Sequence, residues 1–278
     1  MKEKEFQFYI INIPIKPNKE ANAELYEKFF KSVFDRKKYM KIGKDKAAIL
    51  RTYNKSDSNH GIIYGYFSTF TRIDGKHWIN LDNMEKESHE IPKNKFPNLR
   101  ESYYFFFPKI HRFVVMKTSS GVSLKSVLAY FHELKKDLKE PDFEVFYELS
   151  KNSFKEILSA EVVNSLCIEV SYSNAGIGND AFKFVDKDMK DSNTQKIKIE
   201  AKAEKGNGIN IKESKILEGS LKLAESYGNA TASVTVNKRR RTIKTENYPF
   251  VLKIKSSLAD FARFYNKLFS ETNDYLKK

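Results

Sequence analysis

The stretch Phe6–Ile15, FQFYIINIPI, determines the fold that the sequence predicts. It is rich in Phe, Tyr and Ile, which favour β-strands, and prolines at positions 14 and 17 mark its end. We therefore predict a strand followed by a turn. The next segment, Ala21–Phe34, has apolar residues at spacings of three and four, which places them on one side of a helix. The chain thus begins with a strand and an amphipathic helix.

Segments of these two kinds alternate along the rest of the chain. Further strands are predicted at Ala47–Tyr53, Ile62–Ile73, Trp78–Leu81, Ile110–Met116, Phe143–Leu149, Val162–Tyr172, Lys196–Ala203, Ala230–Val236 and Phe250–Ile254. Amphipathic helices are predicted at Ser123–Lys139, Ile209–Ser226 and Leu258–Leu276. This pattern predicts an α+β protein with mixed or antiparallel sheets, helices packed on one face, and repeated β-α-β(β) units.

Composition divides the chain into three expected regions. Residues 1–176 form an α+β N-terminal region, with a candidate internal boundary near 85–100, where two prolines interrupt a polar stretch. Residues 177–195 contain Gly178, Asn179 and a run of mixed charge, so we predict a loop or linker. Residues 196–278 form a basic β-α-β-β-α C-terminal region.

Positive charge gathers in this last region. Of 278 residues, 50 are Lys or Arg and 36 are Asp or Glu, a net charge of +14. Residues 181–278 hold 21 of the basic and 12 of the acidic side chains, a net of +9. Such a field attracts polyanions, so nucleic acid is the expected partner and anionic lipid the next candidate. A generally lysine-rich proteome is the alternative explanation of the total.

The sharpest feature is the run Lys238-Arg239-Arg240-Arg241, which we predict to lie in a turn between two paired strands. Lys244, Lys253 and Lys255 are expected in the same hairpin, and the segment 230–255 holds seven basic residues against one acid, a net of +6. A projecting basic β-ribbon can follow a phosphate backbone, and bound phosphates relieve the repulsion between neighbouring cations. The alternatives are a solvated turn and a surface for an acidic protein.

Two residue pairs point instead to a nuclease. Arg72 and His77 have the spacing of a class of helical ribonucleases, although a turn is predicted between them. Glu200 and Lys202 match half of a metal-dependent nuclease site, in which a carboxylate holds Mg²⁺ and a lysine supports the attacking water. Its second acid would be Asp180, Asp186 or Asp188. No other metal or cofactor is expected, because the five histidines lack zinc-site spacing.

Several features predict a soluble, cytoplasmic protein without a membrane partner. The single cysteine, Cys167, has no partner for a disulfide. The N-terminus lacks the apolar core of a signal peptide, and no apolar run approaches the roughly 20 residues that span a bilayer.

Four segments resemble a bacterial family, domain of unknown function 4747: Phe8–Ile13, the block from Gly65 to Trp78, Ile110-His111-Arg112-Phe113, and Asn179-Asp180. The C-terminal order of helix, Gly228, basic hairpin and helix is similar to exclusion protein A of lambdoid phage and related defence proteins. The resemblance implies phage defence and transfers no catalytic residue. We expect His111 and Arg112 to act structurally, with His111 near the loop that contains Asn174, Asn179 and Asp180.

These observations predict a non-enzymatic, nucleic-acid-binding homodimer, with DNA as the first candidate, in an anti-phage or abortive-infection system. A neighbour-encoded defence protein is a second expected partner. The alternatives are a toxin-like metal-dependent nuclease and a protein-interaction sensor module that does not bind nucleic acid.

Overall fold

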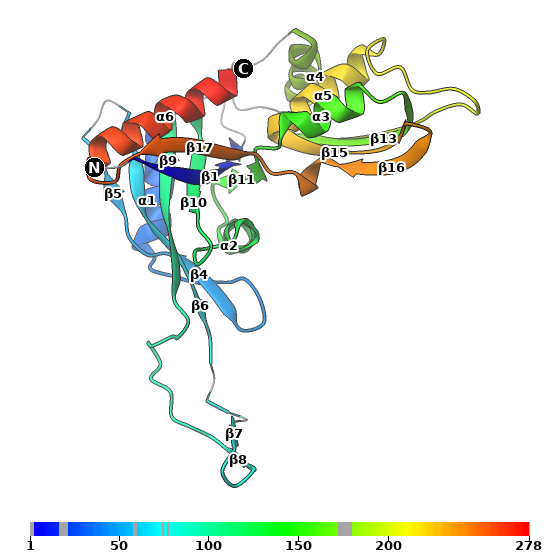
Figure 1. Ribbon diagram of the computed structural model, residues 1–278. Helices are drawn as coiled ribbons and strands as arrows, with labels where there is room; N and C mark the ends of the chain where they lie inside the picture. The colour runs from blue at the N-terminus through cyan, green and yellow to red at the C-terminus, as the bar shows by residue number, and fades with distance from the viewer. Residues whose placement is uncertain are drawn as a thin grey trace.

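The computed structural model describes residues 3–16, 22–57, 60–73, 75–76, 78–171 and 180–277 (Figure 1). Over these residues the chain is an α+β protein, as predicted, and its strands pair in antiparallel sheets. The two largest sheets have nine and four strands and lie side by side (Figure 1). The antiparallel pairing does not confirm the predicted repeats of β-α-β units.

The predicted first strand is β1 (Lys4–Asn12), which lies inside the nine-stranded sheet. The sheet order is β12-β1-β10-β9-β6-β4-β3, with β17 also paired to β1 and β5 to β6. The strands that join β1 are β3 (Met40–Lys41), β4 (Lys46–Leu50), β5 (Asn54–Lys55), β6 (Ile63–Thr71), β9 (Arg100–Phe107), β10 (Arg112–Lys117), β12 (Phe146–Tyr147) and β17 (Val251–Ser256).

Helices cover both faces of this sheet. Helices α1 (Ala23–Asp35) and α2 (Leu124–Asp137) pack on one face, and α6 (Phe261–Lys277) packs on the other. The physical reason is that the central strands are apolar on both sides. In β9, for example, Tyr104 and Phe106 contact the core of α1 and α2, whereas Phe105 and Phe107 contact the core of α6. The prediction of helices on one face therefore does not hold for this sheet.

The four-stranded sheet has helices on one face, as predicted. Its strand order is β14 (Lys196–Lys202), β13 (Val162–Ser171), β15 (Gly228–Val236) and β16 (Arg239–Lys244). Helices α3 (Lys151–Leu158), α4 (Asp180–Asp191) and α5 (Lys215–Tyr227) enclose a core against this face. Figure 1 shows the three helices along one side of the sheet and no helix along the other.

Helix α4 corrects the expectation of a loop or linker at residues 177–195. Val185 and Met189 stand four residues apart and are buried in the core of the four-stranded sheet, so they hold the segment as a helix. The many charged residues and the glycines just before it hid this short apolar stripe. Residues 172–179, with Asn174 and Asn179, lie outside the described residues.

Each main sheet takes strands from both ends of the chain. Strand β17 returns from the C-terminal region to pair with β1, and α6 packs on the same sheet. Strand β13, from the N-terminal region, pairs with β14 and β15. The predicted regions 1–176 and 196–278 are therefore interleaved in space.

Two small elements complete the fold. Strands β2 (Ile15–Lys16) and β11 (Asp142–Phe143) pair beside the nine-stranded sheet. Strands β7 (Trp78–Asn80) and β8 (Glu85–Glu87) form a hairpin in the long connection between β6 and β9, and Figure 1 shows it projecting far from the body. Short 3₁₀ turns, η1 (Pro108–Ile110) and η2 (Thr245–Asn247), follow β9 and β16. None of the helices described is both long and apolar enough to cross a membrane.

Candidate nucleic-acid interface

The face of the four-stranded sheet that no helix covers is polar. In β15, Ala230, Ala232 and Val234 are buried against the helices. Strand alternation turns the hydroxyl residues between them to the opposite side. The register sets these residues in rows across the sheet: Glu200, Cys167, Thr231 and Lys244 form one row, and Lys202, Ser165, Ser233 and Thr242 form the next. We call this surface the bare face.

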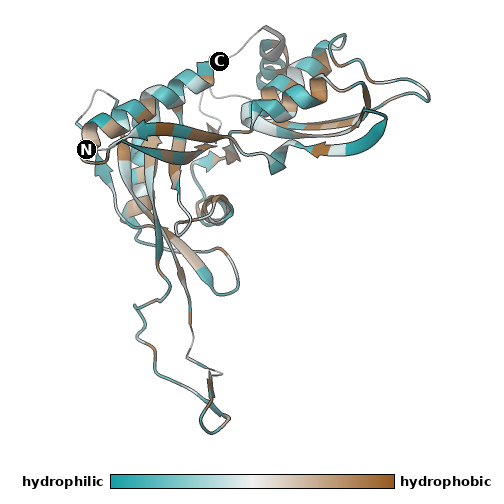
Figure 2. Ribbon diagram, viewed as in Figure 1, coloured by the Kyte–Doolittle hydropathy of each residue, from teal (hydrophilic) through white to brown (hydrophobic). Residues whose placement is uncertain are grey.

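Cations outnumber carboxylates on the bare face. Its exposed cationic residues are Lys196, Lys198, Lys202, Arg240 and Lys244. Its acidic residues are Glu169 and Glu200, so its net charge is +3. Figure 2 shows most of the edge strand β16 as hydrophilic, with one hydrophobic band near its end. No aromatic ring belongs to these rows.

Three of the five cations already have a partner on this face. Lys196 Nζ lies 2.7 Å from Glu169 Oε2, and Lys198 Nζ lies 2.5 Å from Glu200 Oε1. Arg240 Nε donates to Ser233 Oγ at 2.8 Å. The hydrogen bond from Lys198 and its charge lower the pKa of Glu200 below its usual value. Within the described residues, Lys202 and Lys244 form no ion pair, so their charges are available to a ligand.

The run Lys238–Arg241 does not form the predicted basic turn. The turn is made by Asn237 and Lys238, whose φ angles of 49° and 61° suit the tight hairpin between β15 and β16. The three arginines are the first residues of β16. Because successive side chains of a strand point to opposite faces of the sheet, the arginines do not share one face. Arg240 lies on the bare face, whereas Arg241 lies opposite Val234 on the helix side, where it forms an ion pair with Glu156 of α3.

Lys253 and Lys255 do not belong to this hairpin either. They lie on β17, opposite Gln7 and Glu5 of β1 in the nine-stranded sheet. The prediction paired the strand at Phe250–Ile254 with the strand at Ala230–Val236, but β16 takes that place. The turn η2 then redirects the chain before β17, and Pro249 bridges to Leu149.

The residues of the metal-dependent nuclease hypothesis are not brought together. Glu200 and Lys202 are exposed on the bare face, two residues apart on β14. Asp186 is buried in α4 on the helix side of the sheet, with Lys190 Nζ 2.6 Å from its Oδ2, and Asp188 is exposed on the same helix. The side chain of Asp180 lies outside the described residues. The described part of the chain contains no cluster of three His, Cys, Asp or Glu residues that could hold a metal ion.

Of the two residues in the ribonuclease hypothesis, the structure describes only Arg72. Arg72 follows β6, and its backbone N–H donates to the carbonyl of Asp45 at 2.7 Å, which fixes the strand end beside the turn before β4. His77 lies outside the described residues, so the pairing of the two side chains stays a prediction.

A buried polar cluster joins the two main sheets. Arg112 Nε donates to Glu148 Oε1 at 2.9 Å, and its Nη1 donates to Asn12 Oδ1 at 2.7 Å. From α5, Ser226 Oγ donates to Glu148 Oε2 at 3.0 Å, and the Ser226 carbonyl accepts from Asn12 Nδ2 at 3.0 Å. Strands β1 and β10 thus connect to helix α5 through groups shielded from water. The sequence signal was a charged residue inside an apolar run, Ile110–Phe113, but its partners are far apart in the chain.

His111 precedes Arg112 and has a left-handed backbone, with φ 56°. Its ring stacks on Tyr26 of α1, with ring centroids 4.1 Å apart. Burial, with a further contribution from the Arg112 charge, lowers the pKa of His111 to about 4. The imidazole is therefore neutral at neutral pH. The stack on Tyr26 is a structural use, as expected. The predicted proximity to the loop with Asn174, Asn179 and Asp180 stays a prediction, because residues 172–179 and the Asp180 side chain lie outside the described residues.

The fold and the bare face together define the class of protein: an α+β protein with an uncovered, cationic sheet surface that lacks aromatic side chains. The model of the family described as domain of unknown function (DUF4747) matches residues 4–270. The chain belongs to this family, as its sequence resemblance predicted. A search of curated proteins returned no match. The predicted similarity to phage exclusion proteins has no support from these comparisons.

Proposed function

We propose that the protein binds nucleic acid, double-stranded DNA first, through the bare face of the four-stranded sheet. The observation that carries this proposal is the set of five exposed cations on one uncovered sheet surface. Neighbouring strands are about 4.8 Å apart, so the outer strands of this sheet are about 14 Å apart. Duplex DNA carries one phosphate charge about every 1.7 Å of its axis, so a surface of this width faces several phosphates.

The chemistry of the bare face favours phosphate contacts over base contacts. The hydroxyl groups of Ser165, Thr231 and Ser233 can donate to phosphate oxygens between the cations. Proteins that hold single strands stack bases on aromatic side chains, and the bare face offers none. We therefore propose binding that is largely independent of base sequence and stronger for a duplex than for a single strand.

The test is a salt titration of binding to labelled duplex DNA, single-stranded DNA and RNA. Lys202, Arg240 and Lys244 are replaced together by alanine. A matched variant replaces Lys187, Lys212 and Lys215, exposed residues on the helix side of the same sheet. Each lost phosphate contact lowers the slope of log affinity against log salt by about 0.9. We expect the bare-face variant to lose about two to three units of slope and the matched variant to keep the wild-type slope.

Cys167 allows the contact to be located directly. It is the single cysteine of the chain, it lies half-buried in the middle of the bare face, and burial raises the pKa of its thiol. Saturating DNA should slow the reaction of this thiol with a maleimide. An unchanged rate, or equal loss of DNA binding in both triple variants, overturns the assignment to this face.

We also propose that this binding acts in phage defence, an expectation that rests on the order of elements in the C-terminal sequence alone. Cells that express the wild-type protein should then reduce the number of plaques, and cells that express the bare-face variant should not. Dimerisation is part of the same proposal, because two copies double the number of phosphate contacts. A wild-type protein that binds no nucleic acid near physiological salt would favour an acidic protein partner instead.

A further inference from the structure

The hairpin that projects between β6 and β9 ends in exposed apolar side chains. Trp78 is 40% exposed, Ile79 63%, Leu81 74% and Met84 72%. The hairpin itself is well formed, because Trp78 pairs with Glu87 across the strands and Asn80 Nδ2 donates to Glu87 Oε1 at 2.6 Å. An apolar tip of this kind on a projecting element is typical of an interaction site. We call residues Trp78–Glu90 the arm tip.

The charge of the arm tip has the opposite sign to that of the molecule. Residues 78–90 contain four carboxylates and one lysine, a net charge of −3, on a chain whose net charge is +14. Nucleic acid and anionic lipid would be repelled by these carboxylates. The partner must therefore be a cationic protein surface that also offers apolar contact.

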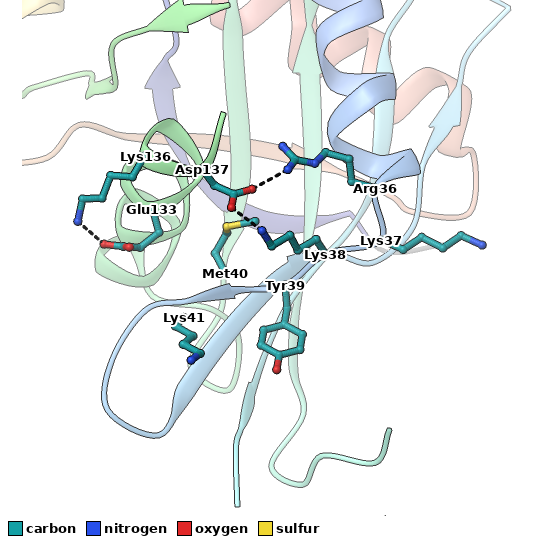
Figure 3. Close-up of a pocket in the computed structure, with 9 residues that line it drawn as sticks. All are labelled: Arg36, Lys37, Lys38, Tyr39, Met40, Lys41, Glu133, Lys136 and Asp137. Atoms are coloured by element: carbon teal, nitrogen blue, oxygen red, sulfur yellow. Dashed lines mark hydrogen bonds and ion pairs between the residues drawn. The ribbon is translucent and has the colours of Figure 1, made fainter. Parts of the chain in front are cut away.

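A surface with these properties lies beside the base of the same arm. It is a concave region of about 720 Å³ between the end of α1, strand β3 and the end of α2 (Figure 3). Five of its nine lining residues are Lys or Arg and two are acidic, a net charge of +3. Asp137 accepts from both Arg36 and Lys38. Lys37 and Lys41 also line the hollow, but their side chains point away from Asp137 and form no ion pair among the described residues.

Tyr39 connects this surface to the arm. Its ring lies 5.6 Å from Phe70 of β6 and 5.7 Å from Phe96, measured between centroids, and these two rings stack at 4.8 Å where the arm leaves the body. When two arms lie antiparallel about a two-fold axis, the tip of each arm meets the base of the other. A two-fold interface is self-complementary in this way, so each copy supplies one acidic tip and one basic receptor.

We propose that the arm tip docks in the basic hollow around Tyr39 of a second copy of this chain. The arms then hold a symmetric dimer through two identical contacts. Each contact combines the burial of Trp78, Ile79 and Leu81 with charge pairing to Lys37 and Lys41. This interface uses a different sheet from the bare face, so it does not depend on nucleic-acid binding.

The first experiment uses Trp78, the only tryptophan of the chain, as a probe at the tip. The protein is diluted without nucleic acid from roughly 100 to 0.1 μM, a range in which many interfaces dissociate. Light scattering is expected to show twice the 32.4 kDa chain mass at the high end. Emission from Trp78 should shift to longer wavelength as the mass falls, because dissociation exposes the ring to water. A monomer throughout, or a dimer with unchanged emission, overturns the proposal.

Charge reversal separates docking from misfolding. Asp82→Lys with Glu85→Lys in the tip, or Lys37→Glu with Lys41→Glu in the hollow, should each weaken the dimer at least about tenfold, because like charges then meet. All four changes in one chain restore opposite charges and should restore the dimer. Reversal of Lys187 and Lys215 on α4 and α5 serves as the control and should have no effect. Failure of the fourfold variant to regain dimer, with its circular dichroism unchanged, counts against this pairing.

Discussion

At the scale of single residues, His111 shows how burial sets the charge state of a group. The ring stacks on Tyr26, and its left-handed backbone is a conformation that His, Asn and Asp adopt more readily than most residues. Protonation would place a second positive charge next to Arg112, away from water. Folding therefore keeps this imidazole neutral at a pH where the unfolded chain would protonate it.

This difference predicts a loss of stability in acid. The pKa of His111 falls from an ordinary 6.5 to about 4 in the folded protein. As the pH drops from 6.5 to 4, only the unfolded state binds the extra proton, so the free energy of unfolding decreases. The total loss is about 3 kcal/mol once the pH is below both pKa values. Urea unfolding at a series of pH values measures it.

His111→Asn should remove this part of the pH dependence, because asparagine accepts the same backbone and does not titrate. At neutral pH it loses the ring stack on Tyr26, at a cost of about 1 kcal/mol. Replacement of the exposed His132 on α2 by asparagine is the control. Equal pH profiles for wild type and His111→Asn would show that another group causes the acid sensitivity.

At the scale of elements, local sequence patterns identified the longest strands and helices. Strand β1 and helix α1 follow from residues close together in the chain, with alternating or three-and-four spacing of apolar side chains. The pairing of the strands was much harder to predict from the sequence. β16 was hidden because three of its six residues are arginines, and β17 then appeared to be the partner of β15.

For the candidate site, too, the sequence identified individual residues but not their arrangement. Glu200, Lys202, Arg240 and Lys244 come together on one face, although the sequence assigned them to two different hypotheses. The alternation of small apolar and hydroxyl residues in β15 could have indicated a strand with one uncovered face. Only the register between four strands shows that these residues form one surface, and register depends on contacts far apart in the chain.

The direct passage from helix α5 to strand β15 leads to a prediction about Gly228. The helix ends at Tyr227 and the strand begins at the next residue, which brings its backbone against β13. A Cβ atom at Gly228 would lie 1.9 Å from the carbonyl oxygen of Glu169, so the two strands would have to separate. We expect Gly228→Ala to destabilise the protein by about 1–3 kcal/mol or more, as measured by urea unfolding.

Gly43 offers the matched control for this substitution. A Cβ atom there would lie 3.7 Å from the nearest side-chain atom, Lys46 Cβ, which is an ordinary contact. Gly43→Ala should therefore leave the midpoint of unfolding nearly unchanged. Equal effects of the two alanines would mean that the close approach of β15 to β13 tolerates a side chain.

At the scale of the whole molecule, the two sheets have separate apolar cores and a shared polar cluster. One sheet packs against α1, α2 and α6, and the other packs against α3, α4 and α5. Between them, Arg112 and Glu148 are 4% and 2% exposed at their side chains, and Glu148 reaches Ser226 of α5. These buried charge-assisted hydrogen bonds therefore help to hold the two sheets in place relative to each other.

Removal of Arg112 should weaken this connection strongly. Arg112→Met leaves the Glu148 carboxylate buried without its cation, and breaking a buried pair in this way costs about 3–5 kcal/mol. Lys28→Met removes an exposed pair with Glu24 on α1 and should leave the free energy of unfolding nearly unchanged, because water screens this pair. In urea, Cys167 labelling reports the four-stranded sheet and circular dichroism reports the whole chain. In the wild type we expect both probes to report one unfolding transition. In Arg112→Met, Cys167 should become reactive at a lower urea concentration than the loss of circular dichroism. Transitions that coincide at the wild-type urea concentration would contradict the role of Arg112 in joining the sheets.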